Sequence, residues 1–222
     1  VTTAGRVDRR DPFGETTPLP MPEKRVLLVG GSPRRSGNTD VVLALFKEIL
    51  DACDVPARTV RLSDIELHPC TGCELCRKSG TCSRFNDGMN VLYPEIERSR
   101  GLVFASPTYN YTVTPEVKMF IDRLYPYFTF TEPRPGPYTA RLAGEGRVIA
   151  TVGICEQNEE SEMRYTLPVM EDAMEAIGYE VIARIAVTGH FYAGTVAHDD
   201  SVRARVADAA APAHAYADRG SR

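Results

Sequence analysis

The chain of 222 residues has the size of one large domain, and its hydrophobic content of 43% is enough to fill a core. A formal net charge of −4 argues against a nucleic-acid-binding protein, because neutralising phosphates requires clustered Lys and Arg. No apolar run approaches the roughly 20 residues that span a bilayer, and the N-terminus lacks the apolar core of a signal peptide. We therefore expect a cytoplasmic protein with neither a nucleic-acid nor a membrane partner.

Two regions differ in their apolar pattern. Residues 1–23 carry several Pro, Thr and Arg without periodicity, which predicts a flexible N-terminal arm. Residues 24–222 alternate short apolar runs with amphipathic stretches, so we expect one domain there. Its first run, "RVLLVGGSP", is typical of a strand buried on both faces. A helix is predicted in "GNTDVVLALFKEILDAC", with Asn38 or Thr39 as its N-cap.

The turn between this strand and helix, "GGSPRRSGNTD", is suited to an anion. Backbone N–H groups and the helix dipole favour negative charge there, and Ser32, Ser36, Asn38 and Thr39 add side-chain donors. The turn lacks both the G-x-G-x-x-G fingerprint and the Gly-Lys-Ser/Thr ending of a nucleotide loop, so a phosphate monoester fits better than a triphosphate. The alternative is a tight turn that only caps the helix.

After a second predicted strand, "ARTVRL" (57–62), four of the six cysteines fall within residues 68–82. They follow the spacing C-x2-C-x2-C-x5-C: Cys70, Cys73, Cys76 and Cys82. Three thiolates at intervals of three let one loop wrap a compact cluster, whereas structural zinc sites usually join two ligand pairs across a longer segment. A reducing cytoplasm disfavours disulfides. We expect an iron–sulfur cluster, with zinc, free thiols and disulfides as the alternatives. His68 is either a ligand, a proton donor or a solvated loop residue.

The middle of the chain contains a further strand between two helices. "MNVLYPEIERS" predicts a helix with Pro94 near its start or at a kink, "GLVFASP" (101–107) a buried strand, and "TPEVKMFIDRLY" a helix that starts at Pro115 and pairs Lys118 with Asp122. Between them, "SPTYNY" offers backbone amides, Tyr and Asn that can stack on a flat ring and hydrogen-bond its edge. The alternative is an ordinary turn with packed tyrosines.

The second half repeats the alternation. Residues 129–146 are too rich in Pro and Gly for regular structure, which predicts an insertion or lid loop. "RVIATVGI" (147–154) and "EVIARIAVTG" predict strands, "TLPVMEDAMEAIG" a helix, and "SVRARVADAAAPAHAYA" a final helix interrupted near Pro212. Five strands that alternate with helices predict a doubly wound α/β fold with a parallel sheet, helices on both faces and ligands at the carboxyl ends of the strands.

Two of these motifs together resemble a known family. "GSPRRSGNT" and "SPTYNYTVTPEVKMFIDRLY" are similar to the flavodoxin-like NAD(P)H-dependent FMN reductases, and the cysteines between them resemble the iron–sulfur flavoprotein branch. The resemblance covers residues 25–190 and implies a flavodoxin-like fold, FMN, a [4Fe–4S] cluster on the four cysteines, an NAD(P)H donor and a homodimer or homotetramer.

The resemblance also implies roles for individual residues. It assigns the FMN phosphate to Ser32, Arg34, Ser36, Gly37, Asn38 and Thr39. It assigns the border of the isoalloxazine ring to Pro107, Thr108, Tyr109, Asn110 and Tyr111, and more weakly to Gly153 in "VGICEQN". In that last segment Cys155 faces either the flavin or the core. "FNDGMN" is similar to the family's Asp-Asp-Met element with Gly88 in place of the second Asp, which leaves open any role of Asp87 beyond capping a helix.

We therefore expect an FMN-dependent oxidoreductase that passes electrons from NAD(P)H to a small-molecule or protein acceptor, with a cluster on the cysteine loop. No Ser-His-Asp order, H-E-x-x-H motif or pair of carboxylates indicates a hydrolase. The alternatives are a reductase of the NAD(P)H:FMN or quinone type without a cluster, an FMN and iron–sulfur electron carrier without its own substrate, and a zinc-braced interaction domain.

Overall fold

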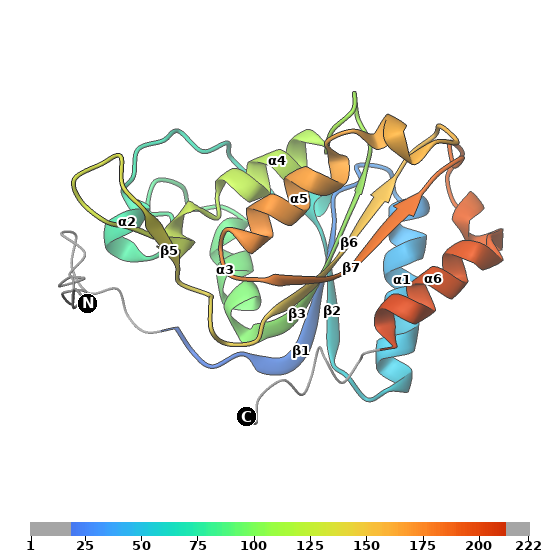
Figure 1. Cartoon of the computed structure of the whole chain (residues 1–222), viewed down its shortest axis with the longest axis horizontal. Coiled ribbons are helices and arrows are strands. Elements are labelled where there is room, and N and C mark those ends of the chain that lie inside the picture. The colour runs from blue at the N-terminus through green and yellow to red at the C-terminus, as the bar shows by residue number, and fades with distance from the viewer. Residues whose placement is uncertain (1–18, 212–222) are drawn as a thin grey trace, which may run out of the picture.

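The computed structural model describes residues 19–211, in which a five-stranded sheet lies between two layers of helices (Figure 1). The strands are β1 (Glu23–Gly30), β2 (Ala57–Arg61), β3 (Ser99–Pro107), β6 (Val148–Ile154) and β7 (Glu180–Val187). They lie in the order β2-β1-β3-β6-β7, and every neighbouring pair is parallel. This order is that of the flavodoxin-like doubly wound fold, so the predicted fold class is confirmed.

Each face of the sheet carries its own helices. On one side α1 (Asn38–Ala52) and α6 (Asp200–Ala210) cover Val26 and Leu28, and on the other side α3 (Met89–Arg98), α4 (Pro115–Asp122) and α5 (Thr166–Glu175) cover Leu27 and Val29. Because side chains alternate along a strand, β1 contributes to both cores, which explains its continuous apolar run. None of the helices in residues 19–211 is long and apolar enough to cross a membrane.

The predicted helix starts are right in one case and wrong in another. Pro115 opens α4 as predicted, and Thr114 caps that helix by accepting the Val117 N–H at 3.4 Å. The N-cap of α1 is Gly37, not Asn38 or Thr39, because the Asn38 side chain bonds to another loop. Pro94 lies inside α3.

The predicted N-terminal arm and the predicted break near Pro212 fall largely or wholly outside the described residues. Within the described part, Leu19 already packs against the core on the α3–α5 side of the sheet. The proposed boundary at residue 24 therefore stays a prediction.

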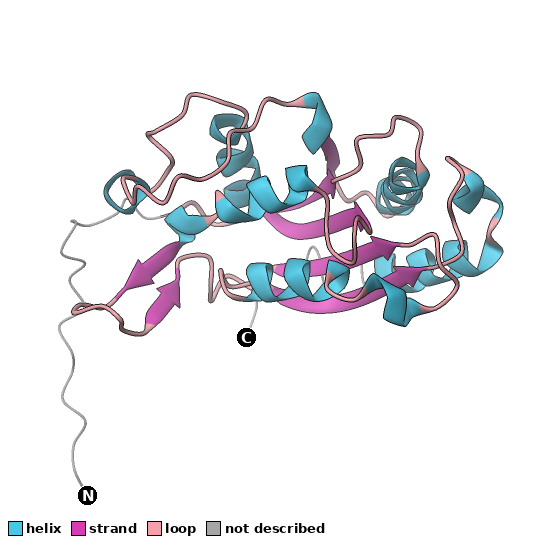
Figure 2. Ribbon diagram, turned by 90° about the horizontal axis from the view of Figure 1, so that it is seen from above, coloured by secondary structure: helices cyan, strands magenta, loops and turns pink. Residues whose placement is uncertain are grey.

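The prediction that residues 129–146 lack regular structure is wrong. β4 (Phe128–Phe130) and β5 (Tyr138–Ala140) form an antiparallel hairpin, which extends away from the main sheet (Figure 2). The Tyr138 ring stacks edge-on against Phe128 at a centroid distance of 5.0 Å and lies 5.8 Å from Phe130. Cross-strand aromatic pairs of this kind stabilise a short hairpin despite a loop rich in Pro and Gly.

Gly31 fixes the distance between the end of β1 and α4. Its N–H donates to the Ala105 carbonyl at 2.8 Å, and its own carbonyl accepts from the Thr114 hydroxyl at 2.7 Å. A Cβ atom at this position would lie 2.0 Å from Cγ2 of Val117, which is completely buried. Only glycine fits where β1 turns into the next loop.

We predict that Gly31→Ala lowers the free energy of unfolding by about 2 kcal/mol, because Val117 has no room to move away. Urea denaturation measures this change. Val91→Ala is the control, since Val91 is exposed on α3 and its loss is expected to change stability by less than about 0.5 kcal/mol. Equal midpoints for Gly31→Ala and the unmodified chain would contradict the close packing.

Candidate functional sites

A pocket opens at the carboxyl edge of the sheet, where the loops after β1, β3, β6 and β7 meet. Its lining comes from the ranges 32–39, 107–109, 154–156 and 190–193. This is where ligands bind in doubly wound folds. Among the residues proposed for FMN, the following line this carboxyl-edge pocket: Ser32, Arg34, Gly37, Asn38, Thr39, Pro107, Thr108 and Tyr109.

The loop after β1 offers donors from its backbone and from Ser32. The buried Ser32 hydroxyl accepts the Arg34 N–H at 3.2 Å, which leaves its own proton for a ligand. α1 starts at Asn38, and the first N–H groups of a helix have no acceptor in a preceding turn. A Cβ on Gly37 would lie 3.2 Å from the Arg34 carbonyl, so the loop is tightly closed. The result is an anion site built mainly from backbone N–H groups.

The side chains of Asn38 and Arg34 hold the outer wall of the pocket. The Asn38 amide donates to the carbonyls of His190 and Tyr192 at 3.3 and 3.0 Å. Its oxygen accepts the Val196 N–H at 3.2 Å. Arg34 donates to the Phe191 carbonyl at 3.1 Å and lies over the Phe191 ring. Asn38 therefore has its backbone N–H, rather than its side chain, available for an anion.

His190 ties this wall to α6. Its Nε2 lies 3.0 Å from Asp199 Oδ2, and its Nδ1 lies 3.0 Å from Thr195 Oγ1. Asp199 also caps α6 by accepting the N–H groups of Ser201 and Val202. The hydrogen bonds from the Ser201 hydroxyl and from His190 hold the pKa of Asp199 well below its usual range.

In the predicted segment "VGICEQN" the residues that line the pocket are Ile154 and Glu156 rather than Gly153, and sequence reasoning missed His190, Phe191 and Ala193. The sequence did contain a signal for His190, Phe191 and Ala193. They lie in "GHFYAG", which follows the predicted strand that became β7, and all parallel strands end at the same edge of the sheet.

The turn that follows β3 is strained. Tyr109 and Thr112 exchange backbone hydrogen bonds of 2.8 and 3.1 Å, which leaves Asn110 and Tyr111 at the tip with φ of 45° and 68°. Asn tolerates this left-handed conformation, but for Tyr it costs on the order of 1–3 kcal/mol. Asn110 and the exposed Tyr111 do not line the carboxyl-edge pocket, so this strained tip stands beside the pocket rather than inside it.

Ser36 and Gly153, which were predicted to contact FMN, and Cys155, whose orientation was left open, do not line the carboxyl-edge pocket. Ser36 sits on the first loop with φ of 54°. Gly153 faces α5, where a Cβ would lie 3.0 Å from Leu167 Cγ and Met163 Sδ. Cys155 is buried in the same core cluster as Met163 and Leu167. The segment after β6 thus supports the pocket from behind, and the Cys155 thiol belongs to the core.

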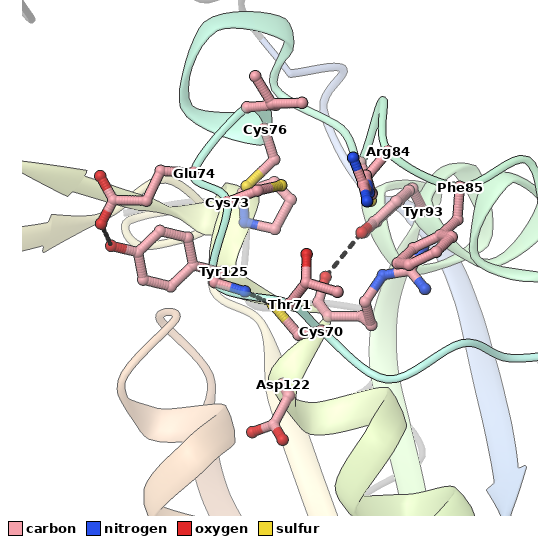
Figure 3. Close-up of a pocket in the computed structure, with 15 residues that line it drawn as sticks. Cys70, Thr71, Cys73, Glu74, Cys76, Arg84, Phe85, Tyr93, Asp122 and Tyr125 are labelled. Atoms are coloured by element: carbon pink, nitrogen blue, oxygen red, sulfur yellow. Dashed lines mark hydrogen bonds between the residues drawn. The ribbon is translucent and has the colours of Figure 1, made fainter.

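A second pocket holds all four clustered cysteines. Cys70, Cys73, Cys76 and Cys82 line it together with Arg84, Phe85, Tyr93, Arg123 and Tyr125. In Figure 3 the labelled cysteines lie between Glu74 and Tyr125 on one side and Arg84, Phe85 and Tyr93 on the other. The six cysteines of the chain all lie within residues 19–211, and none of them forms a disulfide there. Gly72 and Gly80, with φ of 67° and 70°, let the loop curl around this cysteine pocket.

The cysteines differ in their protonation. Burial, together with the charges of the neighbouring cysteines, raises the pKa of the Cys76 thiol to about 11. The hydrogen bond from the Leu75 N–H lowers the pKa of Cys73. The Gly72 N–H donates to Cys70 Sγ at 3.4 Å. Backbone N–H groups are thus directed at the sulfur atoms of two exposed cysteines, whereas the thiol of the partly buried Cys76 loses its proton less readily.

A buried ion pair lies beneath the cysteine pocket. Arg123 donates to both oxygens of Asp87 at 2.8 and 3.0 Å, and the two side chains are 2% and 0% exposed. Arg123 also donates to the His68 carbonyl, while Asp87 accepts the N–H groups of His68 and Met89. Asp87 therefore does more than cap α3. It joins α3, α4 and the start of the cysteine loop. The His68 ring stacks on Phe85 and does not line the cysteine pocket.

Burial acts to raise the pKa of Asp87, but the hydrogen bonds from Arg123 and from two backbone N–H groups lower it to about 2. We predict that this group stabilises the fold above about pH 4 and that about 2 kcal/mol is lost as the pH falls to about 2, since its ordinary pKa is higher than its folded one. Urea denaturation across this pH range measures the loss.

Asp87→Asn is expected to lower the free energy of unfolding by about 3 kcal/mol at pH 7, because Arg123 stays buried without its counter-charge. The control is Asp51→Asn, whose carboxylate pairs with Lys47 on the surface of α1. A stability profile of Asp87→Asn that falls between pH 4 and pH 2 as steeply as that of the unmodified chain would contradict this assignment.

The two pockets share no lining residue and lie at opposite ends of α4. Thr114, just before α4, holds Gly31 in the loop of the carboxyl-edge pocket, while Asp122 and Arg123 line the cysteine pocket. Eight helical residues rise about 12 Å, which gives the scale of the separation. The predicted pair of Lys118 and Asp122 is confirmed as a surface i,i+4 contact on this helix.

The sequence matches the NADPH-dependent FMN reductases over residues 24–163, more than half of the chain. The chain belongs to the NADPH-dependent FMN reductase family. An iron–sulfur flavoprotein of Clostridioides difficile is 37% identical over 102 residues, which cover 45% of this chain and 45% of the relative. One of Archaeoglobus fulgidus is 36% identical over 97 residues, with 44% of each chain covered. One of Methanocaldococcus jannaschii is 33% identical over 105 residues, with 46% and 52% covered.

These matches agree with the iron–sulfur flavoprotein branch that the cysteine loop predicted, although the matched region spans only about half the length of these curated relatives. Among solved structures, an NAD(P)H:quinone oxidoreductase from Methanothermobacter marburgensis has a TM-score of 0.60 at 16% identity and covers 86% of this chain and 98% of its own. An FMN-dependent NADH-azoreductase from Bacillus anthracis, in complex with FMN, has a TM-score of 0.59 at 14% identity, with 88% and 100% covered. At such low sequence identity, these two structures support only the fold and say nothing about activity.

Proposed function

We propose that the chain is an FMN-dependent oxidoreductase that takes electrons from NAD(P)H and delivers them to a small-molecule or redox-protein acceptor. The observation that carries this proposal is the carboxyl-edge pocket, in which the N-terminus of α1 and the tyrosine-bearing loop after β3 meet in a chain of this family. When bound there, FMN would supply hydride chemistry with a reduced nicotinamide and the transfer of one or two electrons to the acceptor.

The residues of the pocket suit the two ends of FMN. A phosphate would accept hydrogen bonds from the Ser32 hydroxyl and from the N–H groups of Gly37, Asn38 and Thr39, where the helix dipole adds positive potential. The flat ring would lie toward residues 107–111, where Tyr109 offers an aromatic face and the backbone offers donors. The proposed FMN site also includes Arg34, which lines the pocket, and Ser36 and Gly153, which shape the loops around it.

We propose a [4Fe–4S] cluster on Cys70, Cys73, Cys76 and Cys82, which would carry single electrons. Three features fit it: the four thiols line one pocket, the N–H groups of Gly72 and Leu75 are directed at sulfur, and Arg84 supplies positive charge beside a group whose thiolates are negative. Within residues 19–211, no three His, Cys, Asp or Glu side chains converge on a position for one metal ion. A single zinc ion would need the cysteine sulfurs about 3.8 Å from one another. In a [4Fe–4S] cluster each cysteine thiolate binds a different iron, so the cysteine sulfurs lie further apart.

The expected homo-oligomer is part of the same proposal. Tyr111 and Tyr165 are joined by a backbone hydrogen bond beside the carboxyl-edge pocket and are 54% and 64% exposed. Exposed aromatic side chains that gather near a site support a contact with another chain.

Steady-state oxidation of NADPH and NADH with quinone acceptors tests the proposed function directly. We expect the absorbance of bound FMN to fall on anaerobic addition of one of the two nicotinamides and to return on addition of a quinone. A protein that binds FMN but whose flavin is not reduced by either nicotinamide would contradict the proposed reductase activity and favour an electron carrier.

We predict that Ser32→Ala weakens FMN binding about tenfold, because a hydrogen bond to a charged phosphate is lost. Fluorescence titration of the flavin-free protein gives the dissociation constant. Riboflavin serves as the matched control ligand, since it lacks the phosphate, and its affinity is expected to stay within about twofold. Equal losses for FMN and riboflavin would place Ser32 away from the phosphate.

We predict that Cys76→Ser removes most of the iron from anaerobically purified protein and leaves the FMN content unchanged, because the two pockets share no lining residue. Iron analysis and flavin absorbance give the two numbers. Cys53→Ser is the control, since this exposed thiol lies at the end of α1. Unchanged iron in Cys76→Ser would contradict the cluster, and joint loss of iron and FMN would contradict two independent sites.

A further inference from the structure

A carboxylate inside the cysteine motif is held by three groups. Glu74 lies between Cys73 and Cys76. Its Oε1 accepts from Arg134 Nη1 at 2.6 Å and from the Tyr125 hydroxyl at 3.1 Å, the latter contact drawn in Figure 3. Its Oε2 accepts from Arg77 at 3.3 Å. One side chain of the cysteine loop thus bonds to Tyr125 and Arg134, which come from a segment more than fifty residues further along the chain.

That segment is residues 125–141, which contain the β4–β5 hairpin and which we call the hairpin arm. Tyr125 and Pro126 at the start of the hairpin arm line the cysteine pocket, and no residue of the arm lines the carboxyl-edge pocket. α2 (Cys76–Ser79) and β5 lie at one end of the molecule, and α1 and α6 lie at the other (Figure 1).

Three more contacts join the hairpin arm to the cysteine loop. Arg77, whose side chain is 3% exposed, donates to Glu132 at 3.2 Å. The Phe130 ring contacts two guanidinium groups, that of Arg77 at 5.4 Å and that of Arg134 at 4.5 Å. Arg141 donates to the Gly80 carbonyl at 3.3 Å. Contacts on both sides of α2 therefore connect the arm to the loop that carries the four cysteines.

The cysteine loop needs such external support. Cys70 and Cys73 are exposed, and the only helix within residues 68–82 is the four-residue α2. Glu74 itself has φ of 57°, a conformation that non-glycine residues keep only where surrounding contacts determine it. A loop with little buried apolar surface gains its shape from tertiary contacts, and groups that orient metal ligands affect metal binding.

We propose that the hairpin arm positions the cysteine loop to hold the [4Fe–4S] cluster and that Glu74 is the positioning residue through which it acts. This inference rests on the proposed cluster. The Glu74 carboxylate bonds to Arg77, Tyr125 and Arg134 rather than to a cysteine. It fixes the backbone between Cys73 and Cys76, and Arg134 fixes Glu74. A single ion pair between such exposed side chains would add little to stability. Here one carboxylate binds two guanidinium groups and a phenol hydroxyl in one network.

The test compares Glu74→Ala, Arg134→Ala and the double variant as anaerobically purified full-length proteins. We expect each single variant to lose iron to a chelator about tenfold faster than the unmodified chain. The double variant is expected to be about as fast as the faster single variant, because both changes remove the same contact. Glu74→Gln, which keeps an acceptor oxygen but no charge, is expected to fall in between, and FMN content is expected to stay constant.

Glu160→Ala is the matched control, since its carboxylate pairs with Arg184 on β7, far from the cysteine loop. A second readout does not depend on iron. In the iron-free proteins, cleavage by trypsin after Lys78 in α2 is expected to be about tenfold faster in Glu74→Ala and Arg134→Ala than in the unmodified chain and the control, because the loop opens more often.

The outcomes distinguish the positioning role of the hairpin arm from the presence of the cluster itself. Iron loss and cleavage at the rates of the unmodified chain would overturn the positioning role while leaving the cluster in place. Faster cleavage with unchanged iron loss would also overturn it, since the arm would then order the loop without affecting the cluster. An unmodified chain without iron would overturn the cluster and, with it, this inference.

Discussion

The buried ion pair between Asp87 and Arg123 is the interaction on which the rest of the site depends. It joins the start of α3, the end of α4 and the backbone at His68, from which the cysteine loop begins. The opposite end of α4 is fixed at Gly31 through the Thr114 hydroxyl. One helix of eight residues thus sets the position of the carboxyl-edge pocket and of the cysteine pocket relative to the same sheet.

The two pockets are built by different means. The carboxyl-edge pocket uses the ends of parallel strands and a helix N-terminus, so its donors are backbone groups that the fold itself directs to one place. The cysteine pocket lies on a loop without regular strands, and its shape comes from the Asp87–Arg123 pair on one side and the hairpin arm on the other. Partial burial raises the pKa of the Cys76 thiol, so its thiolate would form only beside a positively charged group.

The sequence predicted the sheet because buried parallel strands and amphipathic helices leave strong local patterns, and the short apolar runs did become β1, β3 and β6. It also singled out residues 32–39 and 107–109, which meet at the carboxyl-edge pocket, and the four cysteines, which line one pocket, while their roles as ligands stay predictions. What it missed depends on contacts between distant segments. Asn38 bonds to residues more than 150 positions away, and the pairing of β4 with β5 depends on Phe128 and Tyr138 more than on the prolines between them. Local propensity does not encode such contacts.

We propose that one chain carries FMN at the carboxyl edge and a [4Fe–4S] cluster on its cysteine loop. Quantitative analysis of FMN, iron and acid-labile sulfide in protein purified without oxygen tests it most directly. We expect about one FMN, about four irons and about four sulfides per chain, with flavin absorption bands above a broad cluster absorption. FMN without iron or sulfide would contradict the cluster, and a colourless protein that does not take up FMN would contradict the flavin site.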